Sequence, residues 1–248
     1  MGPPTSPWVP CGSAWPTRTA RPPSCAPSRA AAPRYGLGPP PPRSTSRGVT
    51  ISSGESPVRC FIGIPVPVDE GAVRELKARI VDVTPGWRDE KWVPTPNLHV
   101  TLAFLGDVDD DRLDVVESAI DEAMSSSRQF TLVPTSIEPR PSASRASMLW
   151  MAYDDPDGGC SELASSLSVP LERAGFTFER RRFVPHLTLV RARKRRRGPR
   201  LDCTAAERAR FGVSDPVVSL YSSRLSPGGA SYTRLRSWES GGVPPARG

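Results

Sequence analysis

Apolar positions recur between residues 58 and 236 with two spacings, and each spacing predicts one kind of element. Short apolar runs, continuous or alternating with polar residues, are typical of strands, whereas spacings of three and four residues are typical of amphipathic helices. Strands are expected at residues 59–64, 91–93, 99–105, 130–133, 147–153 and 183–191, with a closing hairpin from 217–223 and 232–236. Helices are expected after Asp69, after Asp109–Asp111 and over residues 160–174.

The order of these elements indicates a duplicated unit. The two histidines of the chain both open the same kind of tetrad, His-Val-Thr-Leu at 99–102 and His-Leu-Thr-Leu at 186–189. Each tetrad strand follows a strand and a helix. A pseudo-twofold axis between two such units would bring the histidines face to face across a central groove.

The spacing within each tetrad separates polar from apolar side chains. Residues i and i+2 of a strand face the same side. Each tetrad therefore presents an imidazole and a hydroxyl on one face and two apolar side chains on the other. Two such strands at one cleft would provide two proton-transfer groups and two hydroxyl donors, a set suited to a phosphodiester.

Phosphodiester hydrolysis needs one proton taken from water and one delivered to the leaving oxygen. Two imidazoles with a pKa near 6.5 can divide these roles at neutral pH. The hydroxyls of Thr101 and Thr188 can donate hydrogen bonds to the non-bridging oxygens and so stabilise the transition state. A strained 2′,3′-cyclic phosphate suits such a site, and the chemistry requires no cofactor.

Two other interpretations of the tetrads remain open. A single His-x-Thr segment is usually structural, although two copies that hold every histidine of the chain favour a functional role. Two histidines can also bind zinc, but zinc sites usually add a carboxylate or a cysteine. No His-x-x-His or His-x-Asp spacing occurs in the chain, so we expect no metal site.

Three further residues are candidates for substrate binding. Arg191 either binds the substrate phosphate or ribose, or is a solvated residue at the end of a strand. It lies five positions after His186, so the two share a face only past a bulge or at the strand end. Trp150 and Phe183 flank the tetrad strands and either pack in the core or stack on a nucleobase.

The net charge of +7 comes mostly from the N-terminal part of the chain. Residues 1–54 hold thirteen prolines and six arginines but no Asp, Glu or Lys, and the remainder has 27 basic against 26 acidic residues. Whole-chain charge therefore gives no argument for nucleic-acid binding. Arg193–Arg197, followed by Arg200, is either a solvated loop or a contact for flanking RNA phosphates.

Composition also divides the chain into regions. Residues 1–56 are rich in Pro, Arg and Ser, and such a sequence cannot bury enough apolar surface to offset chain entropy. We expect a disordered extension at 1–56, a folded domain at 57–240 and a flexible tail at 241–248. The extension is an artefact of an upstream start, a basic arm that contacts RNA, or an organelle transit peptide.

Five scattered cysteines without a C-x-x-C pair argue against a disulfide framework and favour a reducing compartment. No run of 18 apolar residues predicts a membrane span, and the N-terminus lacks the apolar core of a secretory signal. We therefore expect a cytoplasmic protein.

These motifs resemble the two-histidine (2H) phosphoesterase superfamily, and within it the bacterial RNA 2′,3′-cyclic phosphodiesterase branch, historically called 2′-5′ RNA ligase. The specific matches are the extended tetrad segments Asn97–Gly106 and Phe183–Arg191, and supporting matches include Arg59–Ile64 and Gly229–Tyr232. The resemblance covers about residues 58–236. The proline-rich extension has no counterpart, and the basic run after Arg191 is unusually basic for the branch.

The resemblance implies an α+β fold that is bilobal with a pseudo-twofold axis, in which antiparallel sheets line a central groove and helices lie outside. It implies metal-independent hydrolysis of RNA 2′,3′-cyclic phosphate ends to 2′-phosphomonoesters. In this branch His99 corresponds to the proton donor and His186 to the proton acceptor. Arg191 matches the arginine that follows the second motif.

Three rival functions remain. The first is the same chemistry on another substrate: a small cyclic nucleotide, a 2′-5′ oligonucleotide or an ADP-ribose cyclic phosphate. The reaction in reverse would join RNA through 2′-5′ bonds. An RNA-binding module with little turnover is the third, although His and Thr at all four tetrad positions argue against it. The expected partners are RNA ends or small cyclic-phosphate nucleotides, and we expect a monomer with no membrane and no obligate protein partner.

Overall fold

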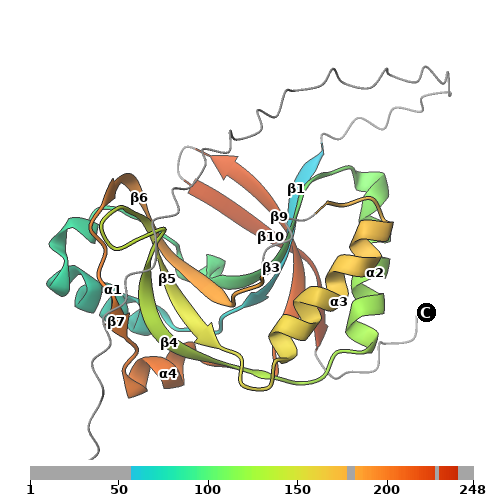
Figure 1. Cartoon of the computed structure of the whole chain (residues 1–248). Coiled ribbons are helices and arrows are strands. Elements are labelled where there is room, and N and C mark those ends of the chain that lie inside the picture. The colour runs from blue at the N-terminus through green and yellow to red at the C-terminus, as the bar shows by residue number, and fades with distance from the viewer. Residues whose placement is uncertain (1–56, 178–181, 227–228, 240–248) are drawn as a thin grey trace, which may run out of the picture. The chain divides into compact units, whose positions relative to one another are not determined.

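An antiparallel sheet of ten strands forms the centre of the computed structural model, which describes residues 57–177, 182–226 and 229–239 (Figure 1). The strands are β1 (Val58–Pro65), β2 (Lys91–Trp92), β3 (His99–Val108), β4 (Thr131–Arg140), β5 (Ala146–Asp154), β6 (His186–Arg196), β7 (Leu201–Asp202), β8 (Val213–Ser214), β9 (Val217–Ser226) and β10 (Gly229–Glu239). The α-helices are α1 (Glu70–Val83), α2 (Leu113–Ser125), α3 (Gly159–Arg173) and α4 (Ala205–Phe211).

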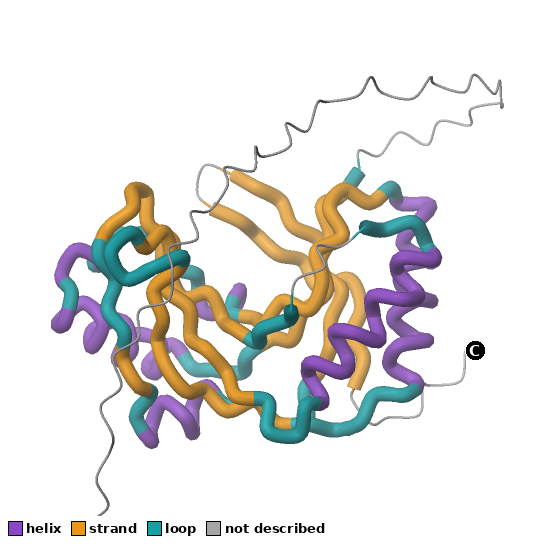
Figure 2. Tube along the Cα trace, viewed as in Figure 1, coloured by secondary structure: helices purple, strands orange, loops and turns teal. Residues whose placement is uncertain are grey.

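The strands follow the order β10-β9-β1-β3-β6-β5-β4-β7, with β2 paired to β6 and β8 paired to β4. The two tetrad strands, β3 and β6, are therefore neighbours in the middle of the sheet (Figure 2). Within their described lengths they meet at one residue pair, Val100 with Leu187. The sheet thus has two halves, and the junction between them carries both tetrads.

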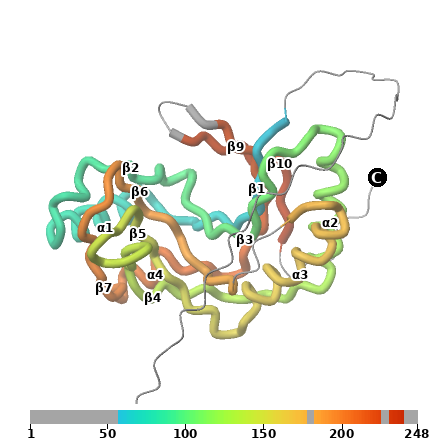
Figure 3. The backbone as a smooth tube through the Cα atoms, turned by 45° about the horizontal axis from the view of Figure 1, so that its top comes forward, coloured from blue at the N-terminus to red at the C-terminus, as the bar shows by residue number. Residues whose placement is uncertain are grey.

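Two helices cross to the half opposite to the strand that they follow (Figure 3). α1 follows β1 but packs beside α4, where Arg79 forms an ion pair with Glu207 at 2.9 Å. α3 follows β5 but lies beside α2, and α2 is joined to β10 by the ion pair of Glu117 with Arg236 at 2.9 Å. This exchange ties the halves together, and the α+β class with two related halves is confirmed.

Local signals in the sequence set the ends of the helices. Asp69 caps α1 by accepting a hydrogen bond from the backbone N–H of Ala72 at 2.8 Å. Gly175, just after α3, has a φ of 87°, a left-handed conformation that favours glycine. α2 begins at Leu113, after a short 3₁₀ turn at Asp110–Arg112.

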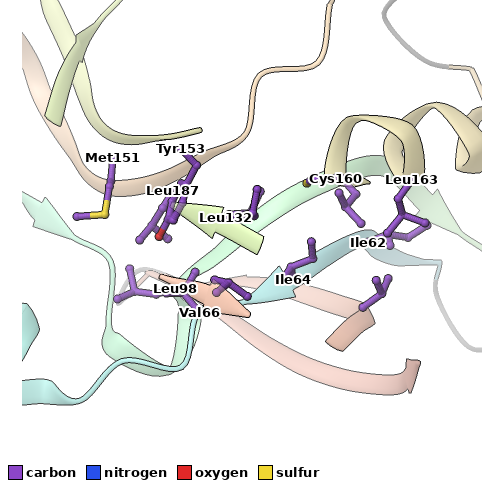
Figure 4. Packing of buried hydrophobic residues seen from close by; sticks show 14 of the residues in the cluster. Ile62, Ile64, Val66, Leu98, Leu132, Met151, Tyr153, Cys160, Leu163 and Leu187 are labelled. Carbon is purple, nitrogen blue, oxygen red and sulfur yellow. The ribbon is translucent and has the colours of Figure 1, made fainter. Parts of the chain in front are cut away.

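The core lies between the sheet and its helices. Ile62 and Ile64 of β1, Leu187 of β6 and Leu163 of α3 are almost completely buried in it (Figure 4). Burial of such side chains contributes about 1.5–3 kcal/mol each. The apolar side chains of the tetrads therefore belong to the core, and their packing holds the His and Thr side chains on the other face of the sheet.

β4 is longer than expected because two prolines fall inside it. The sequence indicated a strand over 130–133, whereas β4 runs to Arg140 through Pro134 and Pro139. A proline lacks the N–H that a second neighbouring strand would need. One edge of β4 pairs with β5. Within the described chain, its other edge pairs only at Thr131–Leu132, with β8, and at Ser136–Ile137, with β7. Neither proline therefore faces a second strand.

The expectations for the region after the second tetrad were also wrong in part. β6 begins at His186 rather than Phe183 and runs to Arg196, so most of the basic run is strand rather than loop. α4 was not expected from the sequence, although Thr204 and Glu207 form a capping box at its start. Seven residues are too few for a clear helical period.

The expected disordered extension at 1–56 and the flexible tail at 241–248 lie outside the described residues. Among the residues that are described, no helix combines the length and the apolar character needed to cross a membrane.

Candidate active site

Both tetrads show the same alternation of half-buried and buried residues. His99, Thr101, His186 and Thr188 are half-buried, whereas the apolar residues between them are buried. Val100 and Leu187, the pair that joins the two strands, are both 0% exposed. All four polar residues therefore lie on the face of the sheet opposite to this buried pair.

The register at the junction sets how the four polar residues are arranged. In antiparallel strands that pair Val100 with Leu187, His99 lies opposite Thr188 and Thr101 lies opposite His186. Directly opposite residues on one face have Cβ atoms about 5 Å apart, and diagonal neighbours about 7 Å. In this register the two imidazoles are diagonal neighbours, and the charge of His186 acts on the pKa of His99.

Each imidazole is oriented by the carbonyl oxygen two residues earlier in the chain. His99 Nδ1 lies 2.7 Å from the oxygen of Asn97, and His186 Nδ1 lies 2.8 Å from the oxygen of Val184. A carbonyl oxygen only accepts, so Nδ1 carries the hydrogen and donates it in both residues. Nε2 is then the nitrogen of each ring that is available for proton transfer.

The surroundings of His186 are cationic and aromatic. The Trp150 ring stacks on the imidazole with centroids 3.6 Å apart, and the Arg140 guanidinium lies 4.9 Å from the centroid of the Trp150 ring. Burial lowers the pKa of His186 below its ordinary 6.5, and the charges of Arg140 and Arg191 lower it further, although the hydrogen bond to Val184 raises it.

The surroundings of His99 are aromatic and more enclosed. Phe61 packs at 4.7 Å between centroids, and Tyr232 presents its edge at 5.4 Å. Gly63 leaves space for the ring, because a Cβ there would lie 3.2 Å from His99 Cδ2. Burial lowers the pKa of His99 and the charges of His186 and Arg191 add to this, against the hydrogen bond to Asn97.

A bulge in β6 brings Arg191 onto the face of the tetrads. Leu149 pairs with Val190 but the next residue, Trp150, pairs with Thr188, so β6 holds one extra residue there. Leu189 and Val190 are consequently both buried, and Arg191 is exposed on the same side as His186. Its charge lowers the pKa of both histidines.

The threonine hydroxyls have no hydrogen-bond partner within the part of the chain that the structure describes. Thr101 lines a groove, and Thr188 lies on the same face of the sheet. Both hydroxyls are half-buried and can therefore donate to a bound group without breaking a contact within the protein.

A groove of about 900 Å³ extends from the tetrads along α3. The proposed contact residues Trp150 and Phe183 line it together with His186 and Thr101, whereas Arg191 and His99 are not part of its wall. α3 contributes small and hydroxyl side chains to its wall and also the carboxylate of Glu172. The groove also includes Phe104, which is 63% exposed. This volume lies within the range of pockets that hold a small-molecule ligand.

Sequence reasoning missed several residues that shape the site. Arg140 was hidden between two prolines in a segment not recognised as strand, and its charge acts on His186. Phe61 and Tyr232 contact His99 from strands far apart in sequence. A glycine inside the apolar run at 59–64 was an available signal, since it indicates a close approach of another group.

Among the described residues, no three His, Cys, Asp or Glu side chains gather closely enough to form a metal site. The groups that do surround the histidines are aromatic rings, two threonine hydroxyls and the guanidinium groups of Arg140 and Arg191. This arrangement can bind an anion and move protons to and from it.

Comparison with known proteins places the chain among phosphoesterases. The model of a family described as LigT-like phosphoesterase matches residues 66–150, a span that includes the first tetrad. The RNA 2′,3′-cyclic phosphodiesterase of Methanothermobacter thermautotrophicus is 31% identical over 182 residues, which cover 72% of this chain and 96% of that protein. The enzyme of the same name from Escherichia coli is 28% identical over 193 residues, with 73% and 96% covered.

Solved structures show the same likeness. The crystal structure of E. coli LigT in apo form superposes with a TM-score of 0.56 at 25% identity and covers 75% of this chain and 98% of that one. E. coli LigT complexed with 3′-AMP gives a TM-score of 0.57 at 25% identity, with 75% and 99% covered. The fold is thus that of a known group of phosphoesterases.

Proposed function

Because the chain belongs to the family of LigT-like phosphoesterases, we propose that it hydrolyses RNA 2′,3′-cyclic phosphate ends to 2′-phosphomonoesters. The observation that carries this proposal is the junction of the sheet. There, two histidines with the same orienting hydrogen bond and two threonine hydroxyls share one face. Relatives named RNA 2′,3′-cyclic phosphodiesterase support the choice of substrate.

The proposed reaction is an in-line displacement at phosphorus. His186 Nε2 takes a proton from water as the water oxygen forms its bond to phosphorus. The bond from phosphorus to the 3′ oxygen breaks, and His99 Nε2 gives its proton to that oxygen. The products are a 3′-hydroxyl and a 2′-phosphomonoester, and a proton from solvent restores His99 while His186 releases one.

The transition state carries extra negative charge on the non-bridging oxygens of phosphorus. Thr101 and Thr188 donate hydrogen bonds to these oxygens, and Arg191 stabilises the charge from the same face. The anionic substrate also raises the pKa of the nearby histidines, which burial and cations lower in the free protein. Substrate binding therefore favours the protonated form of His99, which is the form that delivers a proton.

The aromatic contact residues divide into two roles in this proposal. Trp150 stacks on His186 and holds the plane of the imidazole, so it positions the proton acceptor. Phe183 lines the groove and stacks on the base of the terminal nucleotide. Crystal structures of E. coli LigT contain 3′-AMP and NADP⁺, which supports nucleotide binding by this chain.

The remaining parts of the proposal concern the chain as a whole. Residues 57–240 are the catalytic domain, and the protein acts as a monomer in the cytoplasm without a cofactor or an obligate partner. A variant that lacks residues 1–54 should retain its melting temperature and its turnover of a cyclic mononucleotide. A large loss of either would contradict this division of the chain.

A panel of substrates tests the function. Purified protein is incubated with RNA that ends in a 2′,3′-cyclic phosphate, with 3′,5′-cyclic AMP and with a 2′-5′ dinucleotide, each with and without a chelator. We expect a 2′-phosphomonoester from the first substrate, at the same rate in chelator. Turnover of only another substrate, or loss of activity in chelator, would overturn the proposal.

A further inference from the structure

The strand that carries the second tetrad continues into a segment with unusual charge. From Arg182 to Arg200 the sequence has no acidic residue, and seven of its basic residues lie at or after Arg191. This segment is not a loose loop, because β6 extends to Arg196. Its cations therefore occupy fixed positions on the sheet.

Two arginines of the segment hold it in place. Arg193 and Arg196 both form ion pairs with Glu90, whose side chain is only 5% exposed. The backbone N–H of Arg193 also donates to Glu90 at 2.6 Å, and Trp87 Nε1 donates to the oxygen of Arg197 at 2.9 Å. A buried carboxylate with two cationic partners and an indole hydrogen bond fixes the backbone of this segment.

Four other cations remain exposed beside this anchor. Lys194, Arg195 and Arg197 belong to the segment, and Arg145 comes from the turn between β4 and β5. The turn lies alongside, because Ala146 pairs with Arg196 and a backbone hydrogen bond of 2.9 Å joins Gly198 to Ala143. None of the four has an acidic partner among the residues that the structure describes. We call these four residues the basic strip.

The basic strip is continuous with the candidate active site. β6 connects His186 through Arg191 to the strip, and Arg140 lies at the start of the β4–β5 turn on the other side. Both Arg140 and Arg191 act electrostatically on His186. β6 bulges here, because Arg191 pairs with Met148 whereas Arg196 pairs with Ala146, so five steps along β6 lie opposite two steps along β5. The basic strip therefore stays close to Arg191 along the sheet.

We propose that the basic strip binds the backbone phosphates of RNA on the 5′ side of the cyclic end. This inference rests on the proposed function and specifies its substrate as an oligonucleotide end rather than a cyclic mononucleotide. A cluster of cations without acidic partners beside a phosphodiester site matches the phosphates that precede the cyclic end of an RNA strand. An anionic membrane or an acidic protein would not require continuity with the two histidines.

The test compares substrates of different length in two matched variants of the full chain. The strip variant combines Lys194→Ala, Arg195→Ala and Arg197→Ala. The control variant combines Arg74→Ala, Arg208→Ala and Arg224→Ala, exposed cations on α1, α4 and β9 that form no ion pair within the described residues. The substrates are a 2′,3′-cyclic mononucleotide and oligoribonucleotides of two to ten residues with a 2′,3′-cyclic phosphate end.

We expect kcat/KM of the original chain to rise with substrate length and then level off. The strip variant should lose about tenfold or more on the longer substrates and nothing on the cyclic mononucleotide, whereas the control variant should match the original chain. The slope of log kcat/KM against log salt should become shallower by about 2 if three phosphate contacts are lost, at about 0.7 for each in a single strand.

Other outcomes separate the two proposals. Equal activity on short and long substrates would overturn the basic strip as an RNA contact and leave the proposed function standing. No activity on any cyclic phosphate would overturn the proposed function itself. Binding to vesicles of anionic phospholipid that the strip variant loses, with an unchanged length preference, would assign the strip to a membrane and also overturn the inference.

Discussion

The two halves of the site share the same backbone arrangement around the histidine but differ in the side chains that surround it. In each half, the histidine lies on a strand whose residues point alternately outward and into the core. Its Nδ1 donates a hydrogen bond to the carbonyl oxygen two residues earlier. Around His99 the neighbours are Phe61, Tyr232 and a glycine, whereas His186 has Trp150 and Arg140. A repeated backbone thus makes two equivalent Nε2 atoms, and the side chains around them make the two histidines chemically different.

Replacing either histidine should abolish most of the activity, although the other half of the site stays intact. His99→Ala or His186→Ala should each lower kcat on a cyclic-phosphate RNA end by about 100-fold or more, because each removes one proton transfer. Circular dichroism and the melting temperature should show a retained fold. Near-normal rates in either variant would reject the mechanism.

A substrate with a good leaving group sharpens the comparison further. A nitrophenyl phosphodiester releases an anion that needs no proton, so His99→Ala should lose much less activity on it than His186→Ala does. Equal losses in both variants would contradict the assignment of donor and acceptor.

The threonines should behave alike in the two halves. Thr101→Val and Thr188→Val each remove one hydrogen bond that forms to the transition state, so kcat should fall by about 10- to 100-fold in both. The control substitutions Thr101→Ser and Thr188→Ser keep the hydroxyl and should keep most of the rate. A large loss in only one of the two threonine variants would show that Thr101 and Thr188 do not act alike.

Gly63 tests the closer enclosure of His99. Its Cβ in Gly63→Ala would lie 3.0 Å from the oxygen of Val100 and 3.2 Å from His99 Cδ2. The ring must move, and kcat should fall by about tenfold, since small misplacements of a catalytic group are costly. The control Ile62→Val should lower stability by about 1 kcal/mol and leave kcat unchanged. An unchanged rate in Gly63→Ala would show that the enclosure does not position His99.

The smallest expected effect is a selective pKa change. Arg140 lowers the pKa of His186, and it is not among the groups that lower the pKa of His99. Arg140→Gln should therefore raise the pKa of His186 alone, whereas Arg191→Gln should raise both.

This change also has a defined sign in the pH dependence of the rate. The proton acceptor must be neutral, so the acid side of the pH–rate profile should move to higher pH in Arg140→Gln. Arg140→Lys keeps the charge and should keep the profile. NMR titration of the two imidazoles measures the pKa values directly, and equal shifts in both histidines of Arg140→Gln would contradict the comparison.

Much of the site could be predicted because its key features are local in sequence. The His-x-Thr spacing alone placed each imidazole and hydroxyl on one face, and Asp69 marked the start of α1. The features that could not be predicted depend on pairing between distant segments. The stack of Trp150 on His186 and the bulge that turns Arg191 onto their face are set by the register of β5 against β6.

The same reasoning explains the errors. Pro134 and Pro139 argue against a strand unless it is known that one side of β4 has no partner there. The basic run was interpreted as loop because charge indicates exposure but not backbone conformation. Only the ion pairs of Glu90 with Arg193 and Arg196 show why it continues as a strand.

The central claim is that both Nε2 atoms meet at one phosphorus atom, and ¹⁵N NMR of the histidine rings tests it most directly. The chain has two histidines, so an untagged sample gives four ring nitrogen signals. Titration with a nucleoside 2′-phosphate should shift both Nε2 signals along one binding curve with a single Kd, while both Nδ1 atoms stay protonated. A response from only one histidine, or two curves with different Kd values, would contradict the account.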